Sequence, residues 1–177
     1  MKKLMVILAA VVMAGAAHAA TMSWSITNMQ AMDVEVGWMV ALYDSSAAFD
    51  YDAALAGTQV ALYTTTAAAN GTTVRVSSTG NNKPDGNAYV SGDSISAYAV
   101  VFNAATIADA TQVIISEVRS ATVNAQGSNI SLAFGSMAAT TTANKFLNSS
   151  WQAVPEPTSG LLMLVGLGAL ALRRRRA

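Results

Sequence analysis

Few side chains in this sequence could do covalent or acid–base chemistry. Cysteine is absent, and the single histidine, His18, lies next to an apolar N-terminal stretch. Catalytic triads, cysteine nucleophiles and His- or Cys-based zinc, copper or haem sites therefore lack their required groups in the rest of the chain. A pair of carboxylates remains, Glu35 and Glu117. We expect both on strands, where glutamates usually face solvent, and we predict no catalytic residue and no enzyme activity.

Two groups of oxygen-bearing side chains could bind calcium, which prefers hard oxygen ligands. One group is Asp44, Asp50 and Asp52, and the other is Asn81, Asn82, Asp85 and Asp93. Neither has the spacing of an EF-hand loop. If Asn81 is the first position, Gly86 is the sixth, but Pro84 intervenes and the twelfth position is Gly92 instead of a glutamate. We therefore expect turn and cap residues here, with no metal site and no cofactor.

Aromatic side chains could form a platform on which sugar rings stack, as in carbohydrate-binding modules. The candidates are Trp24, Trp38, Trp151, Tyr43, Tyr51, Tyr63, Tyr89 and Tyr98. So few aromatics in a domain of this size favour core packing, which we expect for most of them. The methionines at positions 22, 29, 32 and 39 also indicate adaptable core filling and not a copper site.

The elements that would position these residues are mostly strands. Short apolar, β-branched runs alternate with turn residues, and we predict strands at residues 23–28, 35–43, 74–78, 95–103, 112–118 and 130–134. Trp24 and Ile26 should share one face of the first strand. The second run is almost wholly apolar, so we expect it to be buried on both faces. Residues 60–63 favour a further strand.

Local signals predict one helix and one exposed loop. Phe49 to Ala56 has helical spacing, and Gly57 can end that helix, which we expect to cap an end of the sheets. The run Lys83-Pro84-Asp85-Gly86 is typical of a type I turn within a loop over residues 78–87. We predict an all-β fold, a single antiparallel β-sandwich of jelly-roll or immunoglobulin type with short helical connections.

The N-terminus has the three regions of a secretory signal peptide. Lys2 and Lys3 precede an apolar run from residue 4 to 14, and Ala17 and Ala19 fit the small-residue cleavage pattern. We predict a signal peptide over residues 1–19, cleaved after Ala19. The alternative, an uncleaved anchor, is disfavoured because the run is short for a membrane span.

Residues 20–153, which we call the cargo domain, are acidic once the two ends are set aside. They carry nine acidic against four basic side chains, so we expect no nucleic-acid partner. About 134 residues suffice for one hydrophobic core. Without cysteine, an exported protein of this kind must be stabilised by packing and not by disulfides.

The C-terminal residues 154–177 form three zones. The step Pro155-Glu156-Pro157 stays extended because proline fixes φ and cannot donate a backbone hydrogen bond. Residues 161–172 are uniformly apolar, and as a transmembrane helix they would span only roughly 20 Å. The cluster Arg173, Arg174, Arg175 and Arg176 would stay cytoplasmic and stop the membrane helix.

This order of motif, short apolar helix and terminal arginines resembles the PEP-CTERM sorting signal of Gram-negative bacteria. The resemblance implies recognition by an exosortase, a membrane-embedded processing enzyme, and delivery to the cell surface or matrix together with exopolysaccharide. The small residues Thr158, Ser159 and Gly160 form the expected processing region, as in other signals where small residues precede a hydrophobic tail. The alternative is a permanent single-span anchor.

We therefore expect an exported surface or matrix protein with a structural or exopolysaccharide-associated role. Its partners would be the secretion machinery, signal peptidase and an exosortase-like enzyme, with transient residence in the inner membrane. One alternative is a carbohydrate-binding module that retains exopolysaccharide, and another is a small glycan-active enzyme that uses Glu35 and Glu117.

Overall fold

The computed structural model describes residues 20–124, 128–142 and 144–154. Strands dominate this part of the chain, with one short α-helix and one 3-10 helix. The elements are β1 (Met22–Thr27), η1 (Met29–Met32), β2 (Met39–Asp44), α1 (Tyr51–Leu55), β3 (Tyr63–Thr66), β4 (Ala68–Asn70), β5 (Thr73–Asn81), β6 (Ser94–Phe102), β7 (Gln112–Ile115), β8 (Arg119–Thr122), β9 (Ile130–Ser136) and β10 (Gln152–Ala153).

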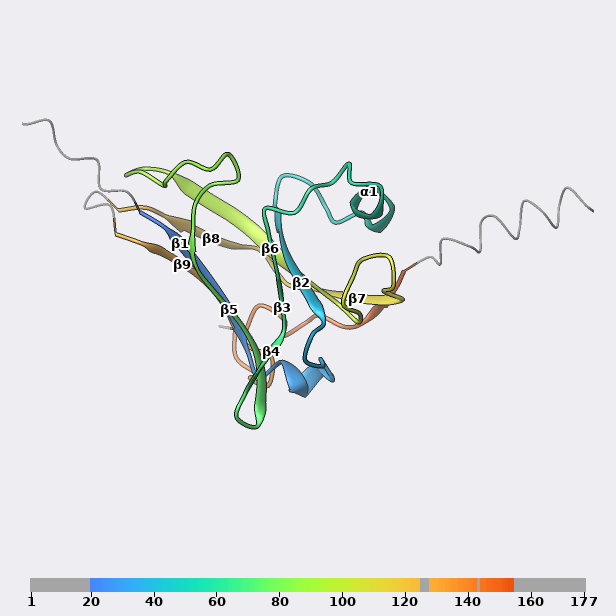
Figure 1. The fold of residues 1–177 in the computed structure, drawn as a ribbon. Helices are drawn as coiled ribbons and strands as arrows, with labels where there is room; N and C mark the ends of the chain where they lie inside the picture. Colours follow the sequence, from blue (N-terminus) through green and yellow to red (C-terminus); the bar gives the residue numbers. More distant parts are fainter. Residues whose placement is uncertain (1–19, 125–127, 143, 155–177) are drawn as a thin grey trace, which may run out of the picture.

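The strands form two sheets that lie as layers (Figure 1). The four-stranded sheet has the order β4-β5-β1-β9, and the six-stranded sheet has the order β10-β7-β6-β2-β3, with β8 also paired to β6. The all-β prediction is confirmed for the described residues. The finer jelly-roll or immunoglobulin topology stays a prediction.

The prediction of a purely antiparallel fold is wrong at one pair of strands. β1 and β9 run parallel, with Met22 opposite Ile130 and Ser25 opposite Ala133. An antiparallel arrangement is enforced locally only where a hairpin joins two strands. β1 and β9 are paired in space but lie near opposite ends of the cargo domain's sequence, so no hairpin joins them. Packing therefore sets their relative direction.

The main core lies between the two sheets. Met22, Trp24 and Ile26 of β1 are at most 1% exposed, while Ser23 and Ser25 between them are partly exposed. The inward residues of β9 meet them, and the buried side chains of β2 and β6 line the opposite wall. The predicted shared face of Trp24 and Ile26 is confirmed, and it follows from the period of two along a strand.

The central strands β2 and β6 of the six-stranded sheet are buried on both faces. Val40 and Leu42 of β2 enter the main core, whereas Ala41 and Tyr43 enter a second core on the outer face. Helix α1 covers this outer face, on the side of β2 and β6 away from the four-stranded sheet (Figure 1). Burial on both faces is therefore confirmed for residues 40–43 of the predicted run 35–43, whereas Glu35 and Val36 are exposed. The prediction that the helix caps an end of the sheets is wrong, because α1 lies on a sheet face. Its position there buries the apolar side chains of the outer face.

Two predicted strands are shorter than expected. Instead of beginning at Glu35, β2 begins at Met39, because Gly37 adopts φ 91° and donates its N–H to the Ala67 carbonyl at 2.8 Å in a turn. The predicted strand at 112–118 ends early, because β7 stops at Ile115. There the Ala99 N–H of β6 donates to the Ser116 hydroxyl at 2.8 Å and not to a backbone carbonyl of the neighbouring strand.

The predicted loop at 78–87 is also shorter, since β5 continues to Asn81. The turn within it is confirmed: Gly86 donates its N–H to the Lys83 carbonyl at 2.8 Å and has φ 85°. Of the run 60–63, only Tyr63 belongs to a strand, and Val60 is 76% exposed.

The described chain ends at the edge of the six-stranded sheet. β10 pairs with β7, and Val154 donates its N–H to the Thr111 carbonyl at 3.0 Å. Pro155 follows directly. Over residues 20–124, 128–142 and 144–154 no helix has the length and apolar character that a membrane crossing requires. The predicted signal peptide and the predicted helix at 161–172 lie outside the described residues.

Candidate functional site

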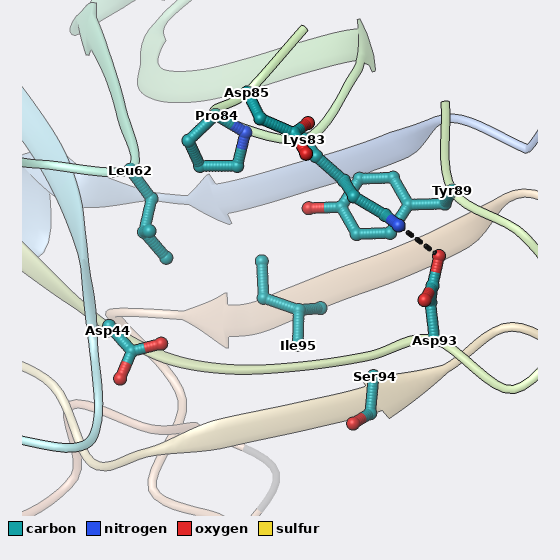
Figure 2. A pocket seen from close by; sticks show the side chains of 9 residues that line it. All are labelled: Asp44, Leu62, Lys83, Pro84, Asp85, Tyr89, Asp93, Ser94 and Ile95. Carbon is teal, nitrogen blue, oxygen red and sulfur yellow. Dashed lines mark ion pairs between the residues drawn. The ribbon is translucent and has the colours of Figure 1, made fainter. Parts of the chain in front are cut away.

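One pocket of about 390 Å³ lies where the 82–93 loop meets the ends of three strands. Asp44 ends β2, Leu62 immediately precedes β3, and Ser94 and Ile95 begin β6. The rest of the lining comes from the loop: Lys83, Pro84, Asp85, Tyr89 and Asp93. Figure 2 shows Ile95 between Asp44 on one side and Lys83 with Asp93 on the other, while Leu62 lies on the same side as Asp44.

A hydrogen-bonded ion pair joins the two ends of the loop. Lys83 Nζ lies 2.7 Å from Asp93 Oδ2, the dashed contact in Figure 2, and 5.9 Å from the centroid of the Tyr89 ring. Asp93 Oδ2 also accepts the Val90 N–H at 2.7 Å. The carboxylate therefore closes the loop at the point where the chain enters β6.

Tyrosine hydroxyls form the inner wall of the loop. The hydroxyl oxygens of Tyr63 and Tyr89 are 2.7 Å apart, and the Tyr63 hydroxyl also donates to the Asn82 carbonyl. Tyr89 is only 3% exposed, and its backbone pairs with Ala20 in an isolated bridge. These contacts attach the loop to β3 and to the start of the cargo domain.

Four side chains of the pocket, Asp44, Lys83, Asp85 and Asp93, are charged at neutral pH. The pKa of Asp93 is lowered by the hydrogen bond from Lys83 and by the Val90 N–H, and the pKa of Lys83 is raised by the same hydrogen bond to Asp93. The pKa of Asp85 is lowered by the backbone and side chain of Asn87, and that of Asp44 by Ser46. Burial raises the pKa of Tyr63 far above its ordinary value.

General acid–base catalysis works best with a pKa near the working pH, and each shift above moves the pKa of its group away from neutrality. Three carboxylates and one ammonium leave the pocket negative. Its chemistry suits a polar, neutral or cationic ligand more than a polyanion.

The tertiary structure regroups the two oxygen clusters that the sequence singled out. Asp44 lies in one pocket with Asp85 and Asp93, whereas Asp50 caps α1 by accepting the Ala53 N–H at 3.0 Å. Among the described residues, no three acidic or histidine side chains are grouped closely enough to hold a metal ion. The interpretation as turn and cap residues is confirmed for Asp44, Asp50 and Asp85, which accept backbone N–H groups two or three residues later.

The two glutamates do not lie on strands as predicted. Glu35 is in the connection between η1 and β2, and Glu117 is in the connection between β7 and β8. Glu117 lies 3.4 Å from Lys145 Nζ and accepts an N–H from Asn148 at 3.4 Å. Sequence reasoning assigned both to strands because their neighbours are apolar, but Gly37 and Ser116 interrupt the sheet at these points.

The aromatic side chains are mainly core residues. Trp24, Tyr43, Tyr51, Tyr89 and Tyr98 are all at most 6% exposed. Trp38 and Trp151 form an edge-to-face pair at 5.8 Å, and the Trp151 Nε1–H donates to the Met32 carbonyl at 2.9 Å. The core-packing interpretation is therefore confirmed for these buried rings. Met22 and Met29 are also fully buried, and Met32 and Met39 pack against the cores.

Comparison with known proteins concerns the C-terminal tail. Residues 153–176 match the PEP-CTERM protein-sorting motif. The match begins in β10 and covers the Pro-Glu-Pro step, the apolar run and the arginines. Searches of curated proteins and of solved structures found no match to this chain.

The sorting motif indicates an exported protein that an exosortase sorts to the cell surface. The resemblance recognised in the sequence is thus confirmed for the tail. The individual site residues Ala17, Ala19, Pro155, Glu156, Pro157, Thr158, Ser159, Gly160 and the four arginines at 173–176 lie outside the described residues. Their separate roles stay predictions.

Proposed function

We propose that the cargo domain is a structural component of the cell surface or exopolysaccharide matrix of a Gram-negative bacterium. The observation that carries this proposal is the sorting motif at residues 153–176. Two features support it: four side chains of the pocket are charged at neutral pH, and the acidic residues of its turns serve local structure. Such a domain acts through its presence and not through turnover.

The proposal includes processing at both ends of the chain. Signal peptidase cuts after Ala19, and the exosortase cuts within residues 157–160 while the helix at 161–172 sits transiently in the inner membrane. The apolar run is short for a permanent span, but it can hold the Pro-Glu-Pro step at the membrane–water boundary. The cytoplasmic arginines would set its orientation.

Intact-mass analysis of the protein from native cells tests this processing. We expect surface material that begins near Ala20 and lacks residues 161–176. Replacing Pro155 and Pro157 by alanine, or Glu156 by lysine, should leave precursor in the inner membrane. Glu35→Gln serves as the matched control, because this exposed carboxylate makes no side-chain hydrogen bond among the described contacts. Surface material that retains peptides from 161–176 would instead support a permanent anchor.

A carbohydrate-binding function is the second candidate, and the pocket of about 390 Å³ favours it. Carboxylates, an ammonium and a serine hydroxyl can hydrogen-bond to sugar hydroxyls, although the buried Tyr89 offers no stacking face. Titration of the purified cargo domain with the polysaccharide of its own cells separates the two candidates. Saturable binding that Asp44→Ala or Asp85→Ala weakens at least tenfold would support the module, and no binding would favour the structural role.

A further inference from the structure

The first strand of the cargo domain lies in the interior of a sheet without a local partner. β1 sits between β5 and β9, and it is antiparallel to β5 and parallel to β9. No hairpin connects it to either neighbour. After the cleavage at Ala19 proposed above, the rest of the chain holds β1 only through pairing, packing and the connection at Asn28.

The slot between β5 and β9 recognises β1 by backbone and by side chains. Besides the two ladders, Asn81 Nδ2–H donates to the Met22 carbonyl at 2.9 Å, and the Thr21 N–H donates to Asn129 Oδ1 at 2.9 Å. Trp24 and Ile26 fill the main core from this strand. Such a combination of ladder and pockets is how an added strand is recognised in β-augmentation. The occupant that fits the slot is thus the segment at residues 20–27 itself.

The connection at Asn28 has the geometry of a hinge. Asn28 adopts the left-handed region at φ 51° and ψ 43°, which is costly for residues other than glycine, though least so for Asn and Asp. The following η1 is attached to the body, because Met29 is fully buried and Gln30 Oε1 accepts the Val74 N–H at 2.9 Å. A change of Asn28 to extended backbone would relieve the left-handed conformation and direct β1 away from its own body.

We propose that β1 is exchanged between copies of this chain, so that residues 20–27 of one copy fill the slot between β5 and β9 of the next. Each copy then donates one strand and accepts one, a head-to-tail contact that forms open filaments or rings. The exchanged contacts are those of the closed chain, so crowding of copies favours the assembly. This inference rests on the proposed matrix function. Strand exchange would let copies of the chain associate in the matrix without disulfide bonds, since the chain has no cysteine.

Engineered cysteines can report the exchange. Ser25 of β1 and Ser77 of β5 are directly opposite each other, and both lie on the outer face of the four-stranded sheet. We would prepare chains of residues 20–154, which contain both cores and every described strand. One chain carries Ser25→Cys and the other, of different tagged mass, carries Ser77→Cys. The two are unfolded together, refolded at high protein concentration and then oxidised.

Exchange predicts a mixed disulfide between the two chains, because residue 25 of one copy then lies against residue 77 of the other. Pairing Ser25→Cys with Thr66→Cys is the matched control, since Thr66 is exposed on β3 of the other sheet. We expect at least a fivefold excess of the 25–77 product over the 25–66 product, measured by intact mass. Equal yields, with circular dichroism spectra showing folded chains, would overturn the proposal.

Variants at the hinge provide a second test. Asn28→Gly and Asn28→Val both lose the hydrogen bond that Asn28 Nδ2–H donates to Ser136 Oγ at 2.7 Å, so the two variants differ in backbone preference. Glycine accommodates the left-handed backbone and valine disfavours it, so the yield of the 25–77 product should be severalfold lower in Asn28→Gly than in Asn28→Val. The same yield in both variants would contradict the role of the hinge. The test uses purified chains without the sorting tail, so its failure leaves exosortase sorting intact, and a failure of sorting in cells leaves strand exchange intact.

Discussion

At the scale of single residues, the acidic side chains of the described domain serve mainly to form turns and caps. Asp44 and Asp85 accept N–H groups two residues later, and Asp50 accepts one three residues later. Asp93 differs because it also forms an ion pair with the Lys83 ammonium across the loop. The pocket is therefore negative because its turns are built with aspartate, a residue whose short side chain bonds to the nearby backbone.

The Lys83–Asp93 pair should stabilise the domain over a defined pH range. The lowered pKa of Asp93 means that its contribution is present above its ordinary value of 3.8 and is lost as pH falls through the folded-state pKa. The raised pKa of Lys83 means that its contribution is present below 10.5 and is lost as pH rises through the folded-state pKa. The full contribution thus lies between these limits.

We predict that Asp93→Asn lowers the melting temperature by a few degrees at about pH 7 and by less at about pH 3, because the contribution of the Asp93 charge declines once the pH falls below the ordinary carboxyl pKa of 3.8. The amide can still accept the Val90 N–H, so the variant isolates the charge. Thermal melts followed by circular dichroism measure the effect, with Glu35→Gln as control. An equal loss at both pH values would indicate lost packing and not a lost ion pair.

At the scale of elements, α1 is a short helix that depends on tertiary contacts for its stability. Five residues cannot form a stable helix alone, since nucleation is unfavourable and only a few backbone bonds close. Tyr51 and Ala54 are buried against the outer face of the six-stranded sheet, and the Tyr51 hydroxyl donates to the Ile107 carbonyl at 2.6 Å. Tertiary packing and the Asp50 cap together stabilise the helix.

Removal of the cap should have a measurable cost. We predict that Asp50→Ala lowers the free energy of unfolding by about 1 kcal/mol, because the Ala53 N–H loses its acceptor. Asp50→Asn keeps a good cap residue and should lose much less. Urea denaturation of both variants measures the difference, and an equal loss in the two would mean that the charge of Asp50 matters more than its hydrogen bond.

At the scale of the whole molecule, two cores and two sheets stabilise a chain that has no cysteine. The start of β1 and strand β10 lie at opposite ends of the domain (Figure 1). β10 is bonded to β7 immediately before the Pro-Glu-Pro step. One residue, Val154, therefore separates this edge strand from the Pro-Glu-Pro step in the sequence.

Metal removal should not change the stability of this domain. Asp44, Asp50, Asp85 and Asp93 accept backbone N–H groups, and Asp93 also pairs with Lys83. No three described acidic side chains lie close enough together to hold a metal ion. We predict that excess EDTA shifts the melting temperature of the cargo domain by less than about 2 °C. A drop of tens of degrees would reveal a structural metal ion, since lost binding energy is lost folding energy.

The sequence alone determined the features that depend on local pattern. Alternating apolar residues predicted the faces of β1, the uniform run predicted a doubly buried β2, and Pro-Asp-Gly predicted the turn after β5. The absence of His and Cys from the cargo domain excluded sites that need those residues. The sorting motif could be recognised from the last two dozen residues alone. Each of these properties depends on neighbouring residues, so no long-range contact was needed to predict it.

Only the tertiary structure decided which distant segments meet. β8 and β10 contain mostly small or polar residues without a strong strand pattern, and they are strands because β6 and β7 offer free edges. The parallel pairing of β1 with β9 depends on packing between segments far apart in the chain, and so does the placement of Asp44 in one pocket with Asp85 and Asp93. These contacts are selected by the burial of both sheets against a common core. The local preferences of neighbouring residues cannot predict them.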